Sequence, residues 1–314
     1  MTADNLVMPF EVKPLGVRGR IVRLGSVVDD ILHRHSYPSP VTAVLAEAVA
    51  LTAMLGASLK FEGKFILQTK SDGPADLIVA DYMSPGKIRG YARFDSEAIA
   101  KLTAPTQPAV LGGGYLAMTV DQGTGMERYQ GIVPLGGVTL GEAAHTYFMQ
   151  SEQIPTRLRL AAGPLFARGA RAETWRAGAI MVQHLPSQGG SSPLPFSSGD
   201  APPGHDENVT ENDAWVKARL LLDTVEDHEL LDPTLSVEDL LYRLYHEDGV
   251  TVYPSVALER YCTCSEERVT ELLTSFSPKD RRDMIKDGEI AVTCEFCSTE
   301  YRFDPARFEG GTAA

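Results

Sequence analysis

The four cysteines of this chain of 314 residues stand in two close pairs near its C-terminus. One residue separates Cys262 from Cys264, two separate Cys294 from Cys297, and 29 residues lie between the pairs. Small zinc modules place four thiolates around one ion in this way, with two close pairs brought together by a folded spacer. The pattern therefore predicts a metal site with these four ligands. Sulfur-only ligation favours zinc over harder divalent ions, and ligand type alone leaves an iron–sulfur cluster open.

The residue chemistry leaves the role of such a site open. The plainest role is that of a zinc ribbon that only stabilises the fold. A catalytic zinc is disfavoured, because a four-cysteine shell leaves no open position for water. A nucleic-acid-binding ribbon is disfavoured too, because residues 258–310 contain 8 Lys and Arg against 12 Asp and Glu. A redox switch stays open, because oxidants attack thiolates and each close pair can form a local disulfide that releases the metal, although a C-x-C disulfide is strained.

The composition is that of an acidic chain with enough apolar residues for a sizeable core. Hydrophobic residues make up 43% of the chain, and the net charge is -13. The length predicts about two domains. The charge repels polyanions, so we expect neither nucleic acid nor an anionic membrane as a partner. The first residues lack the pattern of a secretory signal, and the apolar run 41–59 is interrupted by Glu47, so we expect a cytoplasmic protein.

An N-terminal α+β domain with an antiparallel sheet is expected over residues 1–185. A first helix should begin with Ser39 as its N-cap and Pro40 at the first helical position. A second should open with the capping box of Thr139 and Glu142. Between them, short apolar runs alternate with Gly-containing turns, which favours antiparallel strands over βαβ units.

A loop and a helical linker are predicted between this domain and the cysteines. Residues 186–212 are dense in Pro, Gly and Ser, which predicts a flexible loop. Residues 213–254 predict two or three short helices, with Asp213 capping the first and Ser236 starting the last. The apolar stripe of the last helix is too small to be stable alone, so it must dock on another surface. The stripe includes Leu240, Leu241 and Leu244.

The C-terminal module is predicted over residues 255–314. Its spacer predicts a helix, a loop, a second short helix and a strand before the second cysteine pair. A core of this size is too small to fold without the metal. No G-x-x-x-x-G-K-[ST] loop and no catalytic dyad or triad is visible in the sequence, so we expect neither a nucleotide-driven cycle nor an enzyme.

With these features in place, nearly the whole chain resembles the 33 kDa chaperonin family, the redox-regulated heat-shock holdases of bacteria. The cysteine pattern is that family's signature, and segments such as "HSYPSPVTAVLAEAVALTAMLGASLKFEGKF", "YFMQSEQIPTRL" and "LYRLYHEDGVTVY" are similar to the family's own. Two departures are visible. Ser298 follows the last cysteine where family members often carry Gly, and the segment 186–207 is longer than expected for the family.

The resemblance implies an ATP-independent chaperone of the stress response that is inactive when reduced and zinc-bound. Oxidation would form the disulfides Cys262–Cys264 and Cys294–Cys297, expel the zinc, unfold the linker and expose surface for unfolded client proteins. Leu240, Leu241 and Leu244 would then be candidate client contacts, because release of the helices exposes their apolar face. The resemblance also implies a homodimer on activation. The alternative is a zinc-stabilised binding or adaptor module without redox switching.

Overall fold

The structure is a computed structural model that describes residues 4–59, 62–123, 128–166, 173–185 and 212–308. The chain divides into two compact units, Met1–Arg260 and Tyr261–Ala314. The predicted flexible loop 186–212 lies outside the described residues except for Asn212. The division into four segments that we expect from the sequence stays a prediction.

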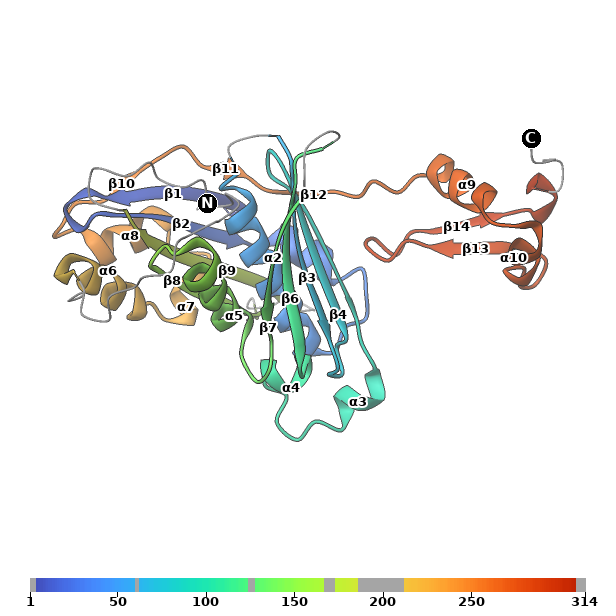
Figure 1. Cartoon of the computed structure of the whole chain (residues 1–314), viewed down its shortest axis with the longest axis horizontal. Coiled ribbons are helices and arrows are strands. Elements are labelled where there is room, and N and C mark those ends of the chain that lie inside the picture. Colours follow the sequence, from blue (N-terminus) through green and yellow to red (C-terminus); the bar gives the residue numbers. More distant parts are fainter. Residues whose placement is uncertain (1–3, 60–61, 124–127, 167–172, 186–211, 309–314) are drawn as a thin grey trace. The chain divides into compact units, whose positions relative to one another are not determined.

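The first unit contains two antiparallel sheets with a long helix packed between them (Figure 1). The strands of the first sheet run in the order β10-β1-β2-β9-β8, and β11 also pairs with β1. Their bounds are β1 Leu6–Val12, β2 Val17–Leu24, β8 Thr156–Leu165, β9 Thr174–His184, β10 Thr251–Val252 and β11 Val256–Ala257. The hairpin of β1 and β2 places Leu6 opposite Arg23 and Val12 opposite Val17.

The second sheet has the order β12-β5-β4-β3-β6-β7. Its strands are β3 Lys64–Ser71, β4 Leu77–Met83, β5 Lys87–Arg93, β6 Gly114–Asp121, β7 Tyr129–Pro134 and β12 Glu259–Arg260. All neighbours are antiparallel except β12, which runs parallel to β5. The prediction of an antiparallel sheet is therefore confirmed.

The long helix α2, Ser39–Gly56, is the centre of the core and contacts strands of both sheets. By length and composition it could cross a membrane, but 78% of it is buried inside the protein, as in the core helix of a globular domain. The prediction of Ser39 as N-cap is wrong by one residue. Pro38 is the cap, and its carbonyl accepts from the amides of Val41 and Thr42 and from the Thr42 hydroxyl, so no side-chain cap is made.

Shorter helices close the edges of this core. They are α1 Ser26–Leu32, α3 Ser96–Ala100, α4 Gln107–Leu111 and α5 Leu140–Tyr147, with the 3-10 turn η1 Lys13–Leu15 and the π-helical turn η2 Phe148–Glu152. The predicted capping box at α5 is confirmed. The Thr139 hydroxyl accepts from the Glu142 amide at 3.2 Å, and the Glu142 carboxylate accepts from the Thr139 amide at 2.7 Å.

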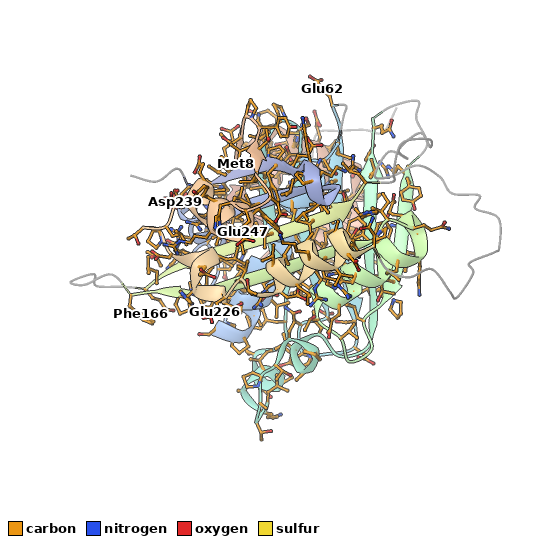
Figure 2. The ribbon with its side chains drawn as sticks, turned by 90° about the vertical axis from the view of Figure 1, so that its left-hand side faces the viewer. Met8, Glu62, Phe166, Glu226, Asp239 and Glu247 are labelled. Carbon is orange, nitrogen blue, oxygen red and sulfur yellow. The ribbon has the colours of Figure 1, made fainter. Side chains whose placement is uncertain are left out.

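Three helices of the predicted linker lie across the outer face of the first sheet (Figure 2). They are α6 Asp213–Asp223, α7 Asp227–Leu231 and α8 Val237–Tyr245. Ser236 caps α8 as predicted, but α6 is capped by Asn212, whose side chain accepts from the Ala214 amide at 2.9 Å. Asn and Asp are equally good caps, so the sequence could not choose between Asn212 and Asp213.

The second unit is a short hairpin packed against helices. Its elements are α9 Glu266–Ser275, α10 Pro278–Asp283, β13 Ile290–Thr293, β14 Glu300–Phe303 and the 3-10 turn η3 Pro305–Phe308. Its core holds five buried hydrophobic residues, namely Val269, Leu273, Ile290, Phe303 and Phe308. The α+β class with a small four-cysteine module at the C-terminus is confirmed.

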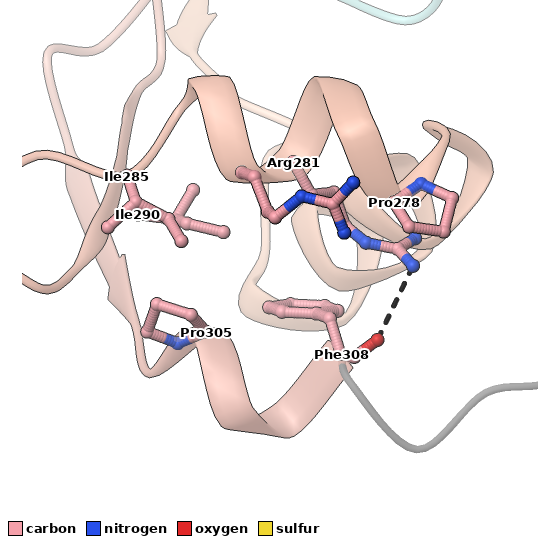
Figure 3. Close-up of a pocket in the computed structure, with 7 residues that line it drawn as sticks. Pro278, Arg281, Ile285, Ile290, Pro305 and Phe308 are labelled. Atoms are coloured by element: carbon pink, nitrogen blue, oxygen red, sulfur yellow. Dashed lines mark hydrogen bonds between the residues drawn. The ribbon is translucent and has the colours of Figure 1, made fainter.

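A pocket in the second unit lies between α10 and η3 (Figure 3). Arg281 extends along it and donates to the Phe276 carbonyl at 2.8 Å and to the Phe308 carbonyl at 3.4 Å. Its guanidinium thereby satisfies carbonyls beyond the end of α9 and at the end of η3. We interpret this pocket as part of the packing of the module, because its polar group already serves the backbone.

Candidate metal centre

The four cysteines converge on one point of the second unit. Cys262 and Cys264 precede α9, and Cys294 and Cys297 lie in the turn between β13 and β14. The Sγ atoms of Cys262 and Cys264 are 3.3 Å apart, those of Cys262 and Cys294 3.7 Å, and those of Cys264 and Cys297 3.3 Å. All four Sγ atoms lie within 4.8 Å of one another, and all four are free thiols.

These distances fit a single bound ion. Four sulfurs at about 2.3 Å from a central metal stand about 3.8 Å apart at the corners of a regular tetrahedron. The three sulfur–sulfur distances of 3.3, 3.7 and 3.3 Å are slightly shorter than that value and far longer than the ~2.05 Å of a disulfide bond. The four residues predicted as ligands are therefore brought together, and they could hold a metal ion. Zinc stays the proposed identity of that metal.

The hairpin turn fixes the second cysteine pair through its backbone. The Cys294 amide donates to the Thr299 carbonyl at 2.9 Å, and the Ser298 amide donates to the Cys294 carbonyl at 2.8 Å. This turn requires a left-handed residue at Ser298, whose φ is 53°. Glycine adopts that conformation without the steric cost of a Cβ, so the Ser298 side chain carries a cost that glycine would avoid.

The start of α9 fixes the first pair. Ser265 caps the helix by accepting from the Arg268 amide at 3.3 Å, and the Arg268 side chain donates to the Thr263 carbonyl at 2.6 Å. The Tyr301 hydroxyl also donates to the Sγ of Cys264 at 3.3 Å. A phenol donor stabilises a thiolate. The Tyr301 hydroxyl therefore favours the metal-binding form of Cys264, against the burial that opposes it.

The neighbouring thiols of Cys264, Cys294 and Cys297 differ in how easily each of them loses its proton. Burial raises the pKa of Cys264 to about 12 and also raises the pKa of Cys294. Burial acts in the same direction on Cys297, but the hydroxyl and amide of Thr299 and the neighbouring thiols outweigh it and lower the pKa of Cys297 to about 6. Sulfurs this close cannot all become thiolates by themselves, because like charges repel. Full deprotonation of the cluster therefore needs a cation, which is the condition for a metal site.

The candidate client contacts are covered in this structure. Leu240 and Leu241 are buried, and Leu244 packs partly buried against the same cluster. The cluster joins α8 to side chains of the first sheet that include Phe10 and Ile180. The predicted docking of the apolar stripe is confirmed. The role of these leucines in client binding stays a proposal.

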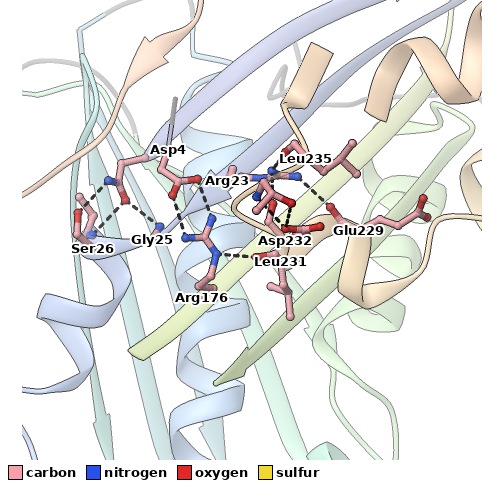
Figure 4. Close-up of polar contacts among 12 residues, drawn as sticks. Asp4, Arg23, Gly25, Ser26, Arg176, Glu229, Leu231, Asp232 and Leu235 are labelled. Carbon is pink, nitrogen blue, oxygen red and sulfur yellow. Dashed lines mark hydrogen bonds and ion pairs between the residues drawn. The ribbon is translucent and has the colours of Figure 1, made fainter. Parts of the chain in front are cut away.

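A buried arginine under the linker helices is a contact that the sequence analysis missed. Arg23 in β2 is 1% exposed, although it is one of the largest side chains of the unit. Its Nη2 donates to the Glu229 carbonyl at 2.9 Å, and its Nη1 donates to the carbonyls of Asp232 and Leu235 (Figure 4). Arg23 thus satisfies backbone carbonyls in α7 and in the connection from α7 to α8.

A second arginine, on the neighbouring strand β9, contacts the last residue of α7. Arg176 in β9 donates to the Leu231 carbonyl at 2.6 Å and forms a two-pronged ion pair with Asp4, with the shorter contact at 2.7 Å (Figure 4). We call Arg23 and Arg176 the arginine latch. Arg23 follows Val17 and Ile21 at even spacing along β2, so strand periodicity would have placed it on the face of the sheet that those residues share, which the linker helices cover.

The comparisons with known proteins agree with the fold and the cysteine cluster. A sequence model of the family described as Hsp33 protein matches residues 5–304. The 33 kDa chaperonin of Caulobacter vibrioides is 44% identical over 307 residues, which cover 96% of this chain and 95% of that protein. The 33 kDa chaperonin of Shigella flexneri is 36% identical over 290 residues, which cover 92% of this chain and 89% of that protein.

Among solved structures, the 33 kDa chaperonin of Thermotoga maritima has the same fold. Its TM-score is 0.73 at 22% sequence identity, and the alignment covers 97% of each chain. Two sheets around one long helix, followed in the chain by a four-cysteine module, define the class of protein to which this chain is similar. The chain belongs to the Hsp33 family, as the resemblance indicated, and its curated relatives are named as chaperonins.

Proposed function

We propose that the protein is a redox-regulated, ATP-independent holdase. In the reduced state, zinc held by Cys262, Cys264, Cys294 and Cys297 keeps the second unit folded and the protein inactive. On oxidation the thiolates form disulfides, the zinc leaves, and the protein binds unfolding proteins before they aggregate. One observation carries this proposal, namely four thiols within 4.8 Å of one another in a unit with a five-residue apolar core.

The dependence of the second unit on its metal follows from the size of its core. Five buried hydrophobic side chains serve the whole unit Tyr261–Ala314, and a core this small does not stabilise a fold of that length without a disulfide or a metal. A structural zinc contributes on the order of 10 kcal/mol or more to small modules. Removal of the thiolate donors should therefore unfold the second unit.

The oxidation step uses the cysteine pairs as two-electron donors. Cys262 with Cys264, and Cys294 with Cys297, each lose two electrons as a sulfur–sulfur bond forms, and any thiol protons pass to solvent. A peroxide accepts the two electrons and is reduced to water or to water and an alcohol. This pairing is the one that the resemblance implies; the Sγ atom of Cys264 is 3.3 Å from those of both Cys262 and Cys297.

The first unit supplies the surface that would bind clients. The helices α6–α8 cover an apolar face of the first sheet, and the arginine latch holds their connection by main-chain carbonyls. Undocking would expose Leu240, Leu241 and Leu244 together with the sheet residues they cover. Extended apolar surface of this kind binds unfolded chains non-specifically.

The remaining parts of the proposal concern partners and location. We propose that the protein is not an enzyme, that its partners are unfolding proteins in the cytoplasm, and that it dimerises on activation. Nucleic acids and anionic membranes are not proposed as partners, because the chain carries a net charge of -13.

The test is an aggregation assay with the full chain in defined redox states. Peroxide or hypochlorite with mild heat should release about one zinc per chain, measured with a chromogenic chelator, and should switch on suppression of client aggregation. Reduction with zinc present should reverse both effects. The matched control is Cys262→Ser/Cys264→Ser/Cys294→Ser/Cys297→Ser, whose activity should not respond to oxidant. Oxidised wild type that suppresses aggregation no better than reduced wild type would leave the adaptor module as the better hypothesis.

A further inference from the structure

The segment that leads from α8 to the cysteines runs along the edges of both sheets. Residues 251–260, which we call the strap, pair with β1 through β10 and β11 and then with β5 through β12 (Figure 1). Val252 lies opposite Phe10, Ala257 lies opposite Leu6, and Glu259 lies beside Lys87. The strap is thus the outermost strand of each sheet at this end of the unit.

The strap is held mainly through its backbone. The Tyr253 amide donates to the Pro9 carbonyl at 2.9 Å, the Leu258 amide to the Asn5 carbonyl at 2.7 Å, and the Glu259 amide to the Gly86 carbonyl at 2.9 Å. Most strap side chains are exposed, and Leu258 is the member that is buried in the main core, at 5% exposure. Contacts of this kind place few demands on the sequence of the strand that makes them.

Without the strap, β1 and β5 would be open edges. Each strand has seven residues, and a free edge of that length offers a row of unpaired amides and carbonyls that another chain can join. The residue before β5 also allows the strap backbone to come close to this edge. Gly86 has a φ of +95°, and a Cβ there would lie 2.1 Å from the Ala257 carbonyl oxygen, so a side chain at this position would push the strap away.

We propose that the edges of β1 and β5 bind extended segments of unfolding proteins, and that the strap occupies these edges in the resting protein. This inference rests on the proposed holdase function. The strap itself indicates the occupant, which is an extended segment with an aliphatic side chain for the position of Leu258. An unfolding protein offers such segments, and main-chain pairing accepts them with little regard to sequence.

The position of the strap in the chain couples its release to the cysteines. Its last residue, Arg260, is separated from Cys262 by a single residue. A folded second unit leaves folded structure at both ends of the strap along the chain, whereas an unfolded one leaves folded structure only at its start, next to α8. A segment held by few buried side chains opens locally at low cost, so a client can compete with it.

The experiment measures binding of a fluorescent peptide with the sequence of residues 250–260 to the full chain. The reduced variant Leu258→Ser lacks the buried anchor of the strap and should bind the peptide at least tenfold more tightly than reduced wild type. The control is Val252→Ser, which removes an exposed apolar side chain of the strap and should bind like wild type. Circular dichroism checks that both variants fold. If Leu258→Ser does not fold, oxidised wild type takes its place.

N-methylated peptides separate edge pairing from contact with an apolar face. Methylation of the amides equivalent to Leu258 and Glu259 removes two donors and should weaken binding at least tenfold. Methylation at the position of Ala257 should not, because amides alternate along an antiparallel ladder and this one faces away from β1. Hydrogen exchange should show added protection in β1 and β5 when the unmodified peptide binds.

Equal binding of all three peptides would mean that side chains carry the interaction, and the inference would be wrong. Dimerisation of Leu258→Ser without peptide binding would also overturn it, because a second copy's strap would then be the occupant. Failure of the inference is distinguishable from failure of the proposed function. If oxidised protein suppresses aggregation but binds methylated and unmodified peptides equally, edge pairing alone is refuted. If methylation weakens peptide binding but the oxidised protein does not suppress aggregation, the holdase function alone is refuted.

Discussion

Replacement of Arg23 by Met should loosen the linker helices while leaving both sheets intact. The Arg23 guanidinium donates to the carbonyls of Glu229, Asp232 and Leu235, and burial lowers its pKa. Met keeps most of the apolar stem but removes all of these donors, so buried carbonyls in α7 and after it lose their partners.

The expected loss in the free energy of docking follows from the three hydrogen bonds that the charged Arg23 guanidinium donates. Each contributes about 1.5–3 kcal/mol, which gives roughly 5–9 kcal/mol for the set. The variant no longer has to bury a cation, and the desolvation cost that it avoids offsets several kcal/mol of this loss. We therefore expect a net loss of about 3 kcal/mol in the free energy of docking. That loss corresponds to a roughly 150-fold larger undocked population.

Hydrogen exchange of the reduced, zinc-loaded variant measures this population. Amides of α7 and α8 that exchange through undocking should exchange about 100-fold faster than in wild type, and those of β3 and β4 should not change. The matched control is Arg93→Met in β5, because the ion pair of Arg93 with Asp76 is exposed at the surface and should contribute at most about 1 kcal/mol. Exchange in α8 within threefold of wild type, in a variant that is otherwise folded, would refute the latch.

Further predictions concern the metal module and one buried carboxyl. Reduced Cys294→Ser should lose hydrogen-exchange protection over residues 256–308 after chelation, and retained protection would show that the metal does not hold the module together. Ser298→Gly should stabilise the zinc-loaded second unit by about 1 kcal/mol in urea unfolding, because φ is 53° there; a destabilised variant would contradict this. Glu152 is buried and accepts from the Tyr147 hydroxyl at 2.6 Å, and burial raises its pKa from 4.5 to about 7. The unfolded state therefore ionises first, and stability falls as the pH rises from 4.5 to 7. Glu152→Gln should stabilise the first unit by about 2 kcal/mol at pH 8 and have little effect at pH 4, measured by denaturant unfolding; equal effects at both pH values would exclude this carboxyl as the cause.

The cysteine cluster was predictable because cysteine pairs carry their chemistry in their spacing. Two close pairs of thiols are typical of small zinc modules, and the residue types alone named the four residues that the structure brings together. The turn at Ser298 shows the limit of that reasoning. The sequence marked Ser298 only as a departure from a resemblance, whereas the positive φ of the turn shows the physical cost of a side chain there.

The sequence by itself determined the α+β class, the two helices and the first strand of the second unit, the start of α5 and the need of α8 for a docking surface, because these depend on local periodicity and capping. Only the tertiary structure decided what α8 docks on, why Arg23 is buried, and that the strap joins the edges of two different sheets. These features are contacts between segments far apart in the chain, and Leu6 and Ala257, for example, are separated by 251 positions. Strand pairing through the backbone depends little on side-chain identity. The exposed residues of the strap therefore cannot be distinguished from a loop in the sequence alone.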